Sequence, residues 1–187
     1  MRKMVIGIVL ILFVVLLVIF IISAYNRLVR ERNFVEEAFS TIDAYLKKRY
    51  DLIPNLVATV KGYKDYEGST LEAVIAARNR YMSATTPEEK IENENMITGA
   101  LGKLFALTEA YPDLKANTNF MKLQDELVKI EGDILQARKY YNGTVRNYNT
   151  ACETFPTVLI AKNFGFKKYP FFTIENEAEK QNVKVEF

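Results

Sequence analysis

The sequence predicts an all-α protein, in which an N-terminal transmembrane helix continues into an antiparallel bundle of about four helices with coiled-coil-like seams. Three observations lead to this prediction. Residues 4–22 form an uncharged apolar run, two later stretches repeat apolar residues at steps of three and four, and no stretch reads as a β-sheet. Steps of three and four place side chains on one face of a helix, against which a second helix can pack.

The apolar run from Met4 to Ile22 is long enough to cross a bilayer, because its residues span roughly 28 Å as a helix. The alternative is a cleaved secretory signal, since a short basic tail, residues 1–3, precedes the run. However, the run is longer than the ~7–15 residues of a signal peptide. Ile22-Ser23-Ala24 is also a poor cleavage site. We therefore predict an uncleaved anchor at residues 4–24.

The first bundle helix follows the anchor directly and contains Pro54. Its apolar seam keeps the same helical phase before and after the proline, so we predict one long helix that bends there and ends near Gly62 or Gly68. Asp51 and Asn55 flank the bend, either to satisfy the backbone groups that it frees or to form a partner-binding notch. The seam consists of Leu28, Val35, Phe39, Ile42, Leu46, Ile53, Val57 and Val60.

Two shorter helices come next. Ser69 and Glu72 have capping-box spacing, which predicts a helix start at Ser69. Thr86-Pro87 predicts a third helix, because proline is favoured at the first helical position. Tyr111-Pro112-Asp113 is expected to close that helix. Its apolar side is Ile91, Ala100, Leu101, Leu104, Phe105 and Thr108.

The fourth helix has the most regular seam, extending over about five heptads. Pro156 should end it, and a short turn over residues 157–164 with a C-cap at Gly165 should complete a bundle domain of residues 25–165. Residues 166–187 are expected to form an irregular C-terminal tail. The seam consists of Phe120, Leu123, Leu127, Ile130, Ile134, Ala137, Tyr141, Val145, Tyr148, Cys152 and Phe155.

The sequence offers few residues for catalysis, metal binding or nucleic-acid binding. The chain has no histidine, which removes the commonest metal ligand and general base. Beyond Arg2 and Lys3 there are 23 basic residues against 23 acidic ones, so no basic footprint for nucleic acid remains. We expect no enzyme, no cofactor and no metal. Two carboxylate pairs at helical spacing could contribute to an all-oxygen cation site, but such pairs are far more often a solvated face: Glu88 with Glu92, and Glu126 with Asp133.

Two further features can be interpreted either as structural packing or as a functional site. Cys152 falls in the apolar seam, where a free cysteine is usually a small buried hydrophobe, so packing is favoured over a reactive thiol. Residues 140–149 are dense in tyrosine and asparagine. They form either a polar recognition surface or a helix–helix seam with hydrogen-bonded edges, and the second interpretation is favoured.

Three pieces of sequence, found together and in order, carry a family resemblance: DLIPNLV around Pro54, EAYPDLKAN, and LQDEL. With the longer runs around them, and with FPTVLIAKNFGFKKYPFF, the chain resembles the bacterial LemA family over nearly its whole length beyond the anchor. Tyr45 and Tyr169-Pro170-Phe171-Phe172 depart from the usual pattern. The resemblance implies an anchored, all-helical protein without agreed catalytic residues. It also implies relatives among membrane-organising proteins of magnetosome-forming bacteria.

These observations predict a non-catalytic, membrane-anchored scaffold that contacts the bilayer through residues 4–24. We expect it to form homo-oligomers and to recruit protein partners, which the sequence does not identify. The alternative is a receptor or sensor subunit that switches at the Pro54 bend. The resemblance implies the inner (cytoplasmic) membrane of a bacterium. Arg27, Arg30 and Arg32 outnumber Arg2 and Lys3, which predicts a single-pass protein with its helical domain in the cytoplasm.

Overall fold

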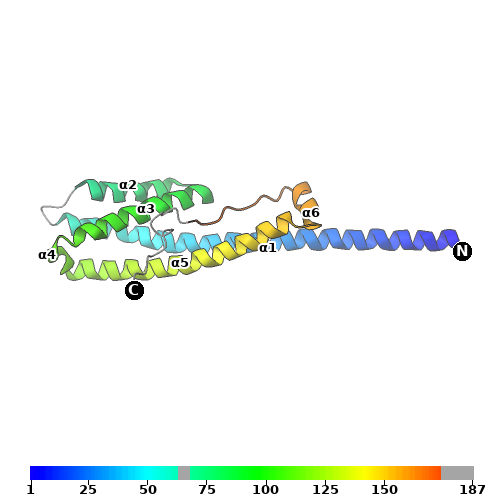
Figure 1. Ribbon diagram of the computed structural model, residues 1–187, viewed down its shortest axis with the longest axis horizontal. Helices are drawn as coiled ribbons and strands as arrows, with labels where there is room; N and C mark the ends of the chain where they lie inside the picture. The colour runs from blue at the N-terminus through cyan, green and yellow to red at the C-terminus, as the bar shows by residue number, and fades with distance from the viewer. Residues whose placement is uncertain (63–67, 174–187) are drawn as a thin grey trace, which may run out of the picture. The chain divides into compact units, whose positions relative to one another are not determined.

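The computed structural model describes residues 1–62 and 68–173. These residues contain no strand, so the predicted all-α class is confirmed. In chain order the helices are α1 (Arg2–Lys61), α2 (Gly68–Ser83), α3 (Pro87–Thr108), α4 (Pro112–Lys115), α5 (Thr118–Glu153) and α6 (Thr157–Asn163) (Figure 1).

The helices divide between two compact units. Unit 1 contains Met1–Ser40 and Lys139–Phe171, which are the first part of α1, the last part of α5, and α6. Unit 2 contains Thr41–Arg138 together with the residues from Phe172 onward, of which the structure describes two. Helices α1 and α5 therefore contribute to both units.

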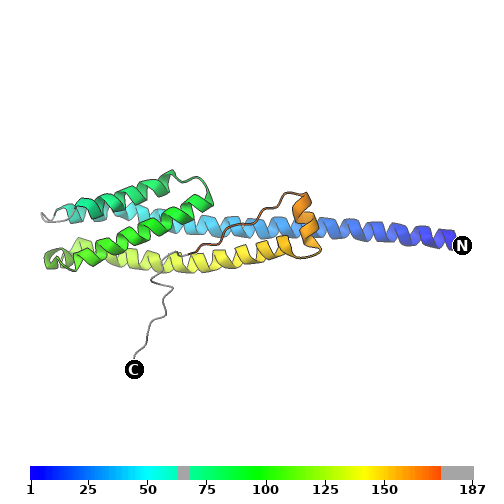
Figure 2. The ribbon, with the colours of Figure 1, turned by 45° about the horizontal axis from the view of Figure 1, so that its top comes forward.

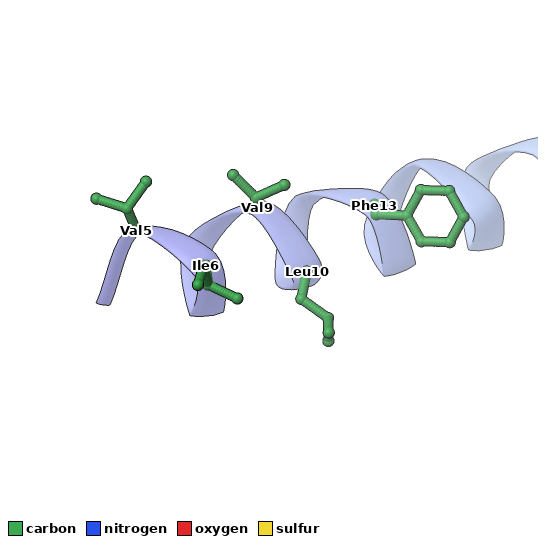
Figure 3. A pocket seen from close by; sticks show the side chains of 5 residues that line it. All are labelled: Val5, Ile6, Val9, Leu10 and Phe13. Carbon is green, nitrogen blue, oxygen red and sulfur yellow. The ribbon is translucent and has the colours of Figure 1, made fainter. Parts of the chain in front are cut away.

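The N-terminal part of α1 has no protein core around it. An 18-residue window of this helix is apolar enough to cross a membrane and none of it is buried. Figure 3 shows Val5, Ile6, Val9, Leu10 and Phe13 projecting from the helix, where they line an open apolar groove. Side chains of this type in such density are normally covered, by protein or by lipid.

Burial in unit 1 begins at the end of the apolar run. Ala24, Leu28 and Val35 of α1 are buried, as are Tyr141 and Tyr148 of α5. Phe39 meets Tyr141 with ring centroids 5.8 Å apart. The seams predicted for the first and fourth helices thus lie on buried faces in this unit.

In unit 2 the chain reverses direction between successive long helices, so that the later part of α1, α2, α3 and the early part of α5 alternate up and down (Figures 1 and 2). The core is built from residues at steps of three and four on each helix. Its members include Ile42, Leu46, Ile53 and Val60 of α1; Leu71, Val74 and Ala77 of α2; Ile91, Ile97 and Leu104 of α3; and Leu127, Ile130 and Ile134 of α5.

Local capping explains where two helices start. At α3 the Thr86 Oγ1 accepts a hydrogen bond from the Glu89 amide at 3.2 Å. The Glu89 Oε2 in turn accepts one from the Thr86 amide, also at 3.2 Å. This reciprocal pair is a capping box. At α5 the Asn117 Oδ1 accepts from the Asn119 and Phe120 amides at 2.9 and 3.1 Å.

Several boundaries differ from the sequence prediction. Helix α2 includes Gly68, one residue before the predicted start, and Tyr111-Pro112 leads into the one-turn helix α4. The predicted turn over residues 157–164 is instead the helix α6. Gly165, at φ 72°, follows its C-cap, and the Phe166 amide donates to the Ala161 carbonyl oxygen at 3.0 Å, as in a Schellman motif. Of the predicted tail, residues 174–187 lie outside the described part.

Candidate functional site

The residues singled out by sequence lie on α1 in unit 2. Pro54 is inside the helix, which continues to Lys61. A proline has no amide hydrogen, so the carbonyl of Tyr50, one turn earlier, loses its intrahelical donor. The structure supplies a donor from another helix, since the Arg78 Nε of α2 donates to the Tyr50 carbonyl oxygen at 3.2 Å.

Asp51 and Asn55 do not provide that donor. Both side chains are exposed, and the Asn55 carbonyl oxygen accepts a hydrogen bond from the Thr59 Oγ1 at 2.9 Å. Asn55 also lines an open surface groove of about 400 Å³ formed with α5 residues, among them Asn119 and Lys122. Asp51 is not among its lining residues, so the structure does not bring the two flanking side chains into one notch.

A buried charge network, absent from the predictions made from sequence, lies next to the proline. Arg49 of α1 and Glu94 of α3 form an ion pair, and both side chains are 0% exposed. Arg138 of α5 binds the other Glu94 oxygen. One carboxylate therefore lies between two guanidinium groups, which come from two other helices.

Further side-chain donors and acceptors join this network, although the Nε atoms of Arg49 and Arg138 are buried without a hydrogen-bond partner. The Tyr50 hydroxyl donates to the Glu94 Oε2 at 2.8 Å, and the Thr98 hydroxyl donates to the Oε1 at 3.2 Å. Glu131 of α5, whose side chain is partly exposed, accepts from the Arg49 Nη1 at 2.6 Å. Two arginines thus face two glutamates, and the formal charges of the network cancel.

The network holds Arg49 in its charged form. Burial opposes the charge, but Glu94 and Glu131 outweigh burial and hold the pKa of Arg49 above its usual value. Burial is also the main cause that raises the pKa of the Tyr50 hydroxyl, and the Glu94 carboxylate raises it further. Tyr50 is therefore a neutral hydrogen-bond donor at any physiological pH.

A second, smaller cluster continues from Tyr50 toward the surface. The Tyr50 and Tyr81 rings lie 4.2 Å apart between centroids. The Tyr81 hydroxyl donates to the Asp43 Oδ1 at 2.6 Å, and the Lys90 Nζ lies 2.7 Å from the same oxygen. Burial opposes the charge on Asp43, but Lys90 and Tyr81 outweigh burial and hold its pKa below 3.8.

Chemically, this arrangement is suited to hold helices together. Because the Arg49 and Glu94 side chains are fully buried, no solute reaches them, and their charges are already paired. In some helical proteins a buried polar network of this kind specifies which helices pair and in which register. In the described residues, Glu88, Glu92, Glu126 and Asp133 are not brought into any group of three or more potential metal ligands.

The network did leave a signal in the sequence. Arg49 is three residues after Leu46 and four before Ile53, and Glu94 is three residues from both Ile91 and Ile97. Each charged residue therefore falls in phase with an apolar seam. Two charges of opposite sign at core positions of different helices are the pattern that predicts a buried pair.

The tyrosine- and asparagine-rich segment of α5 holds another part of unit 1. The Asn149 side chain donates to the Tyr169 carbonyl oxygen at 2.9 Å and accepts from the Tyr169 amide at 3.0 Å. The Tyr141 hydroxyl donates to the Pro170 carbonyl oxygen at 2.9 Å. These polar groups bind the chain's own segment after α6, which neither sequence interpretation included.

The fold and this site define a helical protein with one N-terminal helix apolar enough to span a membrane. The chain belongs to the LemA family, whose sequence pattern matches residues 38–187. The resemblance stated from the sequence is therefore confirmed. The apolar helix fits a membrane-associated protein of this family.

Individual relatives agree with this membership. Protein LemA of Metamycoplasma hominis is 28% identical over 162 residues, which cover 84% of this chain and 72% of that protein. Magnetosome protein MamQ of Magnetospirillum gryphiswaldense is 32% identical over 73 residues. A MamQ protein of Paramagnetospirillum magneticum matches to the same degree. Each magnetosome match spans only 39% of this chain and 27% of the relative.

Proposed function

We propose that this protein is a membrane-anchored helical scaffold that self-associates at the bilayer and performs no catalysis. One observation carries the proposal: a single helix, α1, contains both the exposed apolar run and residues of the buried core. A membrane-spanning helix that continues into a packed helix transmits the position of the anchor to the bundle. Such a connection suits a protein that organises other molecules at a membrane.

The buried network supports a structural role for the polar residues. Its carboxylates accept hydrogen bonds from guanidinium and hydroxyl groups, and Arg49 and Glu94 are out of contact with solvent. A catalytic acid or base needs access to a reacting atom. The magnetosome relatives support this proposal only at family level, because the matches cover less than half of this chain.

Helix α5 offers a surface for self-association. Met121, Val128 and Leu135 are all exposed, and they follow one another at intervals of seven residues. Residues seven apart lie on nearly the same line of a helix, which is the spacing that a coiled-coil partner contacts. We propose that a second copy of the chain packs along this line, which we call the α5 stripe.

The test is the oligomeric state of the purified full chain in detergent, measured over a range of protein concentrations. We expect oligomers in the unaltered chain, and Val128→Glu should shift the equilibrium toward monomer because it places a charge in the apolar contact. Met82→Glu changes an exposed apolar side chain of α2 and serves as the control. A chain that is monomeric at every concentration contradicts self-association, and equal effects of the two variants contradict the α5 stripe.

The alternative, a sensor subunit that switches at Pro54, requires α1 to move there. The hydrogen bond from Arg78 to the Tyr50 carbonyl and the buried Arg49 beside it both favour a fixed shape of α1 at this point.

For orientation we propose that the bundle lies in the cytoplasm, because Arg27, Arg30 and Arg32 follow the apolar run closely.

A further inference from the structure

Three aromatic rings meet where the apolar run of α1 ends. The Tyr25 ring lies 5.0 Å from the Phe164 ring and 5.6 Å from the Phe166 ring, measured between centroids. Phe164 and Phe166 follow directly after α6, which lies against the early part of α1 in both ribbon views (Figures 1 and 2). Aromatic side chains at the end of a membrane span are typical of the membrane–water interface.

Three large apolar side chains in and around α6 are exposed to solvent. Phe155 is 80% exposed, Leu159 54% and Phe164 58%. Ile160 and Ala161 of the same helix are buried, so α6 already has a face that packs against the protein. The seam prediction for Phe155 is wrong, since α5 ends at Glu153 and the Phe155 ring points into solvent. We call Phe155, Leu159 and Phe164 the α6 face.

Basic side chains accompany this face. Lys162 and Lys167 are exposed. The Lys168 Nζ lies 2.6 Å from the Glu153 Oε1. The central carbon of the Arg32 guanidinium lies 5.7 Å from the centroid of the Phe166 ring. An apolar surface beside lysines is the combination that binds at the boundary between acyl chains and anionic headgroups.

We infer that the α6 face inserts into the interface of the bilayer, with Lys162 and Lys167 at anionic phospholipid headgroups. The inference rests on the proposed membrane span of α1 and adds a second, shallow membrane contact to it. The Tyr25 contacts select lipid as the occupant, because they place Phe164 beside the first residue after the predicted anchor at residues 4–24. A bilayer crossed by residues 4–24 therefore meets the protein at this level.

The test measures the depth of single side chains in the full-length protein, reconstituted into lipid vesicles. A Cys152→Ala background removes the native thiol, and a polarity-sensitive fluorophore is attached at Leu159→Cys or, as a second position, Phe155→Cys. Met82→Cys is the exposed control in α2, and Leu12→Cys reports on the span itself. Each probe is challenged with nitroxide lipids labelled near the headgroup, with nitroxide lipids labelled at the bilayer centre, and with aqueous iodide.

We expect headgroup-level nitroxides to quench the probes at residues 159 and 155 severalfold more than the probe at residue 82. The probe at residue 12 should respond to the deep nitroxide. Quenching at residue 159 should increase when phosphatidylglycerol is added to phosphatidylcholine, and Lys162→Gln with Lys167→Gln should remove that increase. Shallow quenching without any dependence on anionic lipid would overturn the role of the two lysines.

Other outcomes separate the two proposals. If the probe at residue 12 is deep while the probes at residues 159 and 155 respond to iodide as the control does, the α6 contact is wrong and the span stands. If residue 12 itself is open to iodide, both proposals fail. Protection of residue 159 from lipid and from iodide alike would assign the α6 face to a protein partner or a second copy, and would overturn the lipid contact.

Discussion

At the residue scale, Glu94 is a carboxylate whose side chain is fully buried in unit 2. Removing a carboxylate from water costs several kcal/mol, and the protein offsets that cost only if good partners surround it. Glu94 has four such partners, Arg49, Arg138, Tyr50 and Thr98. Replacing one member therefore costs more than the loss of one hydrogen bond, because the buried charges that remain are no longer balanced.

We predict that Glu94→Gln lowers the free energy of unfolding by about 3–5 kcal/mol, because it leaves the two guanidinium groups with one carboxylate fewer in a buried site. Glu92→Gln, the same change at an exposed position of the same helix, should cost less than about 0.5 kcal/mol. Unfolding in detergent, followed by circular dichroism, measures both. Equal effects would contradict the role of the buried network.

A second prediction concerns pH. Asp43 has a lowered pKa in the folded protein, so its charged form stabilises the fold above the ordinary aspartate pKa of 3.8. That contribution disappears as the pH falls from 3.8 through the lowered folded value. The stability difference between the unaltered chain and Asp43→Asn should accordingly be constant near neutral pH and shrink below 3.8. Denaturant midpoints measured across this range would check it.

Residue-level burial could be predicted only in part. The apolar seam of α1 was predicted position by position, and its residues are buried apart from a half-buried Phe39. Arg49 and Glu94 were missed because charge normally marks the solvent face of a helix. Which carboxylate meets which guanidinium depends on the relative placement of three helices, and no periodicity along one chain encodes that placement.

At the element scale, Pro54 shows how a defect in one helix can be repaired by another. The proline deletes the donor for the Tyr50 carbonyl, and Arg78 replaces that donor from α2. An acceptor left without a donor in a half-buried site costs about 1–3 kcal/mol. The interaction with Arg78 therefore makes the proline tolerable within α1 and ties α1 to α2.

We therefore predict a coupling between Pro54 and Arg78. Arg78→Ala alone should lower the unfolding free energy by about 1–3 kcal/mol. In a Pro54→Ala background the new amide can donate to the Tyr50 carbonyl, so the cost of Arg78→Ala should fall by about 1 kcal/mol. A double-mutant cycle, measured by denaturant unfolding, tests this. Arg80→Ala, exposed on the same helix, should not couple to Pro54. Additive effects of Arg78→Ala and Pro54→Ala would show that the carbonyl does not need Arg78.

Element boundaries were predictable where a local signal exists. Thr86-Pro87 correctly predicts the start of α3, and Gly165 has the positive φ expected of a glycine that follows a helix C-cap. The seven residues of α6 are too few to establish a helical period, so the sequence predicts only a turn there. The attachment of residues 169 and 170 to Asn149 and Tyr141 joins segments twenty or more residues apart, so it left no local pattern.

At the scale of the whole molecule, the proposed membrane anchorage depends on the apolar run of α1. On insertion scales Leu, Ile, Val and Phe each contribute roughly −0.3 to −0.6 kcal/mol, whereas a central lysine costs about 2.5–3.5 kcal/mol. Residues 4–22 consist almost entirely of such apolar residues. Their sum exceeds the cost of one lysine, but three central lysines would cancel it.

We therefore predict that Leu12→Lys alone leaves the protein in the membrane fraction, whereas the triple variant Leu12→Lys, Leu16→Lys, Ile19→Lys is released from it. The measurement is the share of full-length protein that stays with membranes after alkaline carbonate washing, which removes peripheral contacts such as the one proposed for α6. Alanine at the same three positions is the matched control, since it shortens the side chains without adding charge, and this variant should stay bound. If the triple lysine variant also resists washing, the run at residues 4–22 is not the anchor and the membrane attachment must come from another part of the chain.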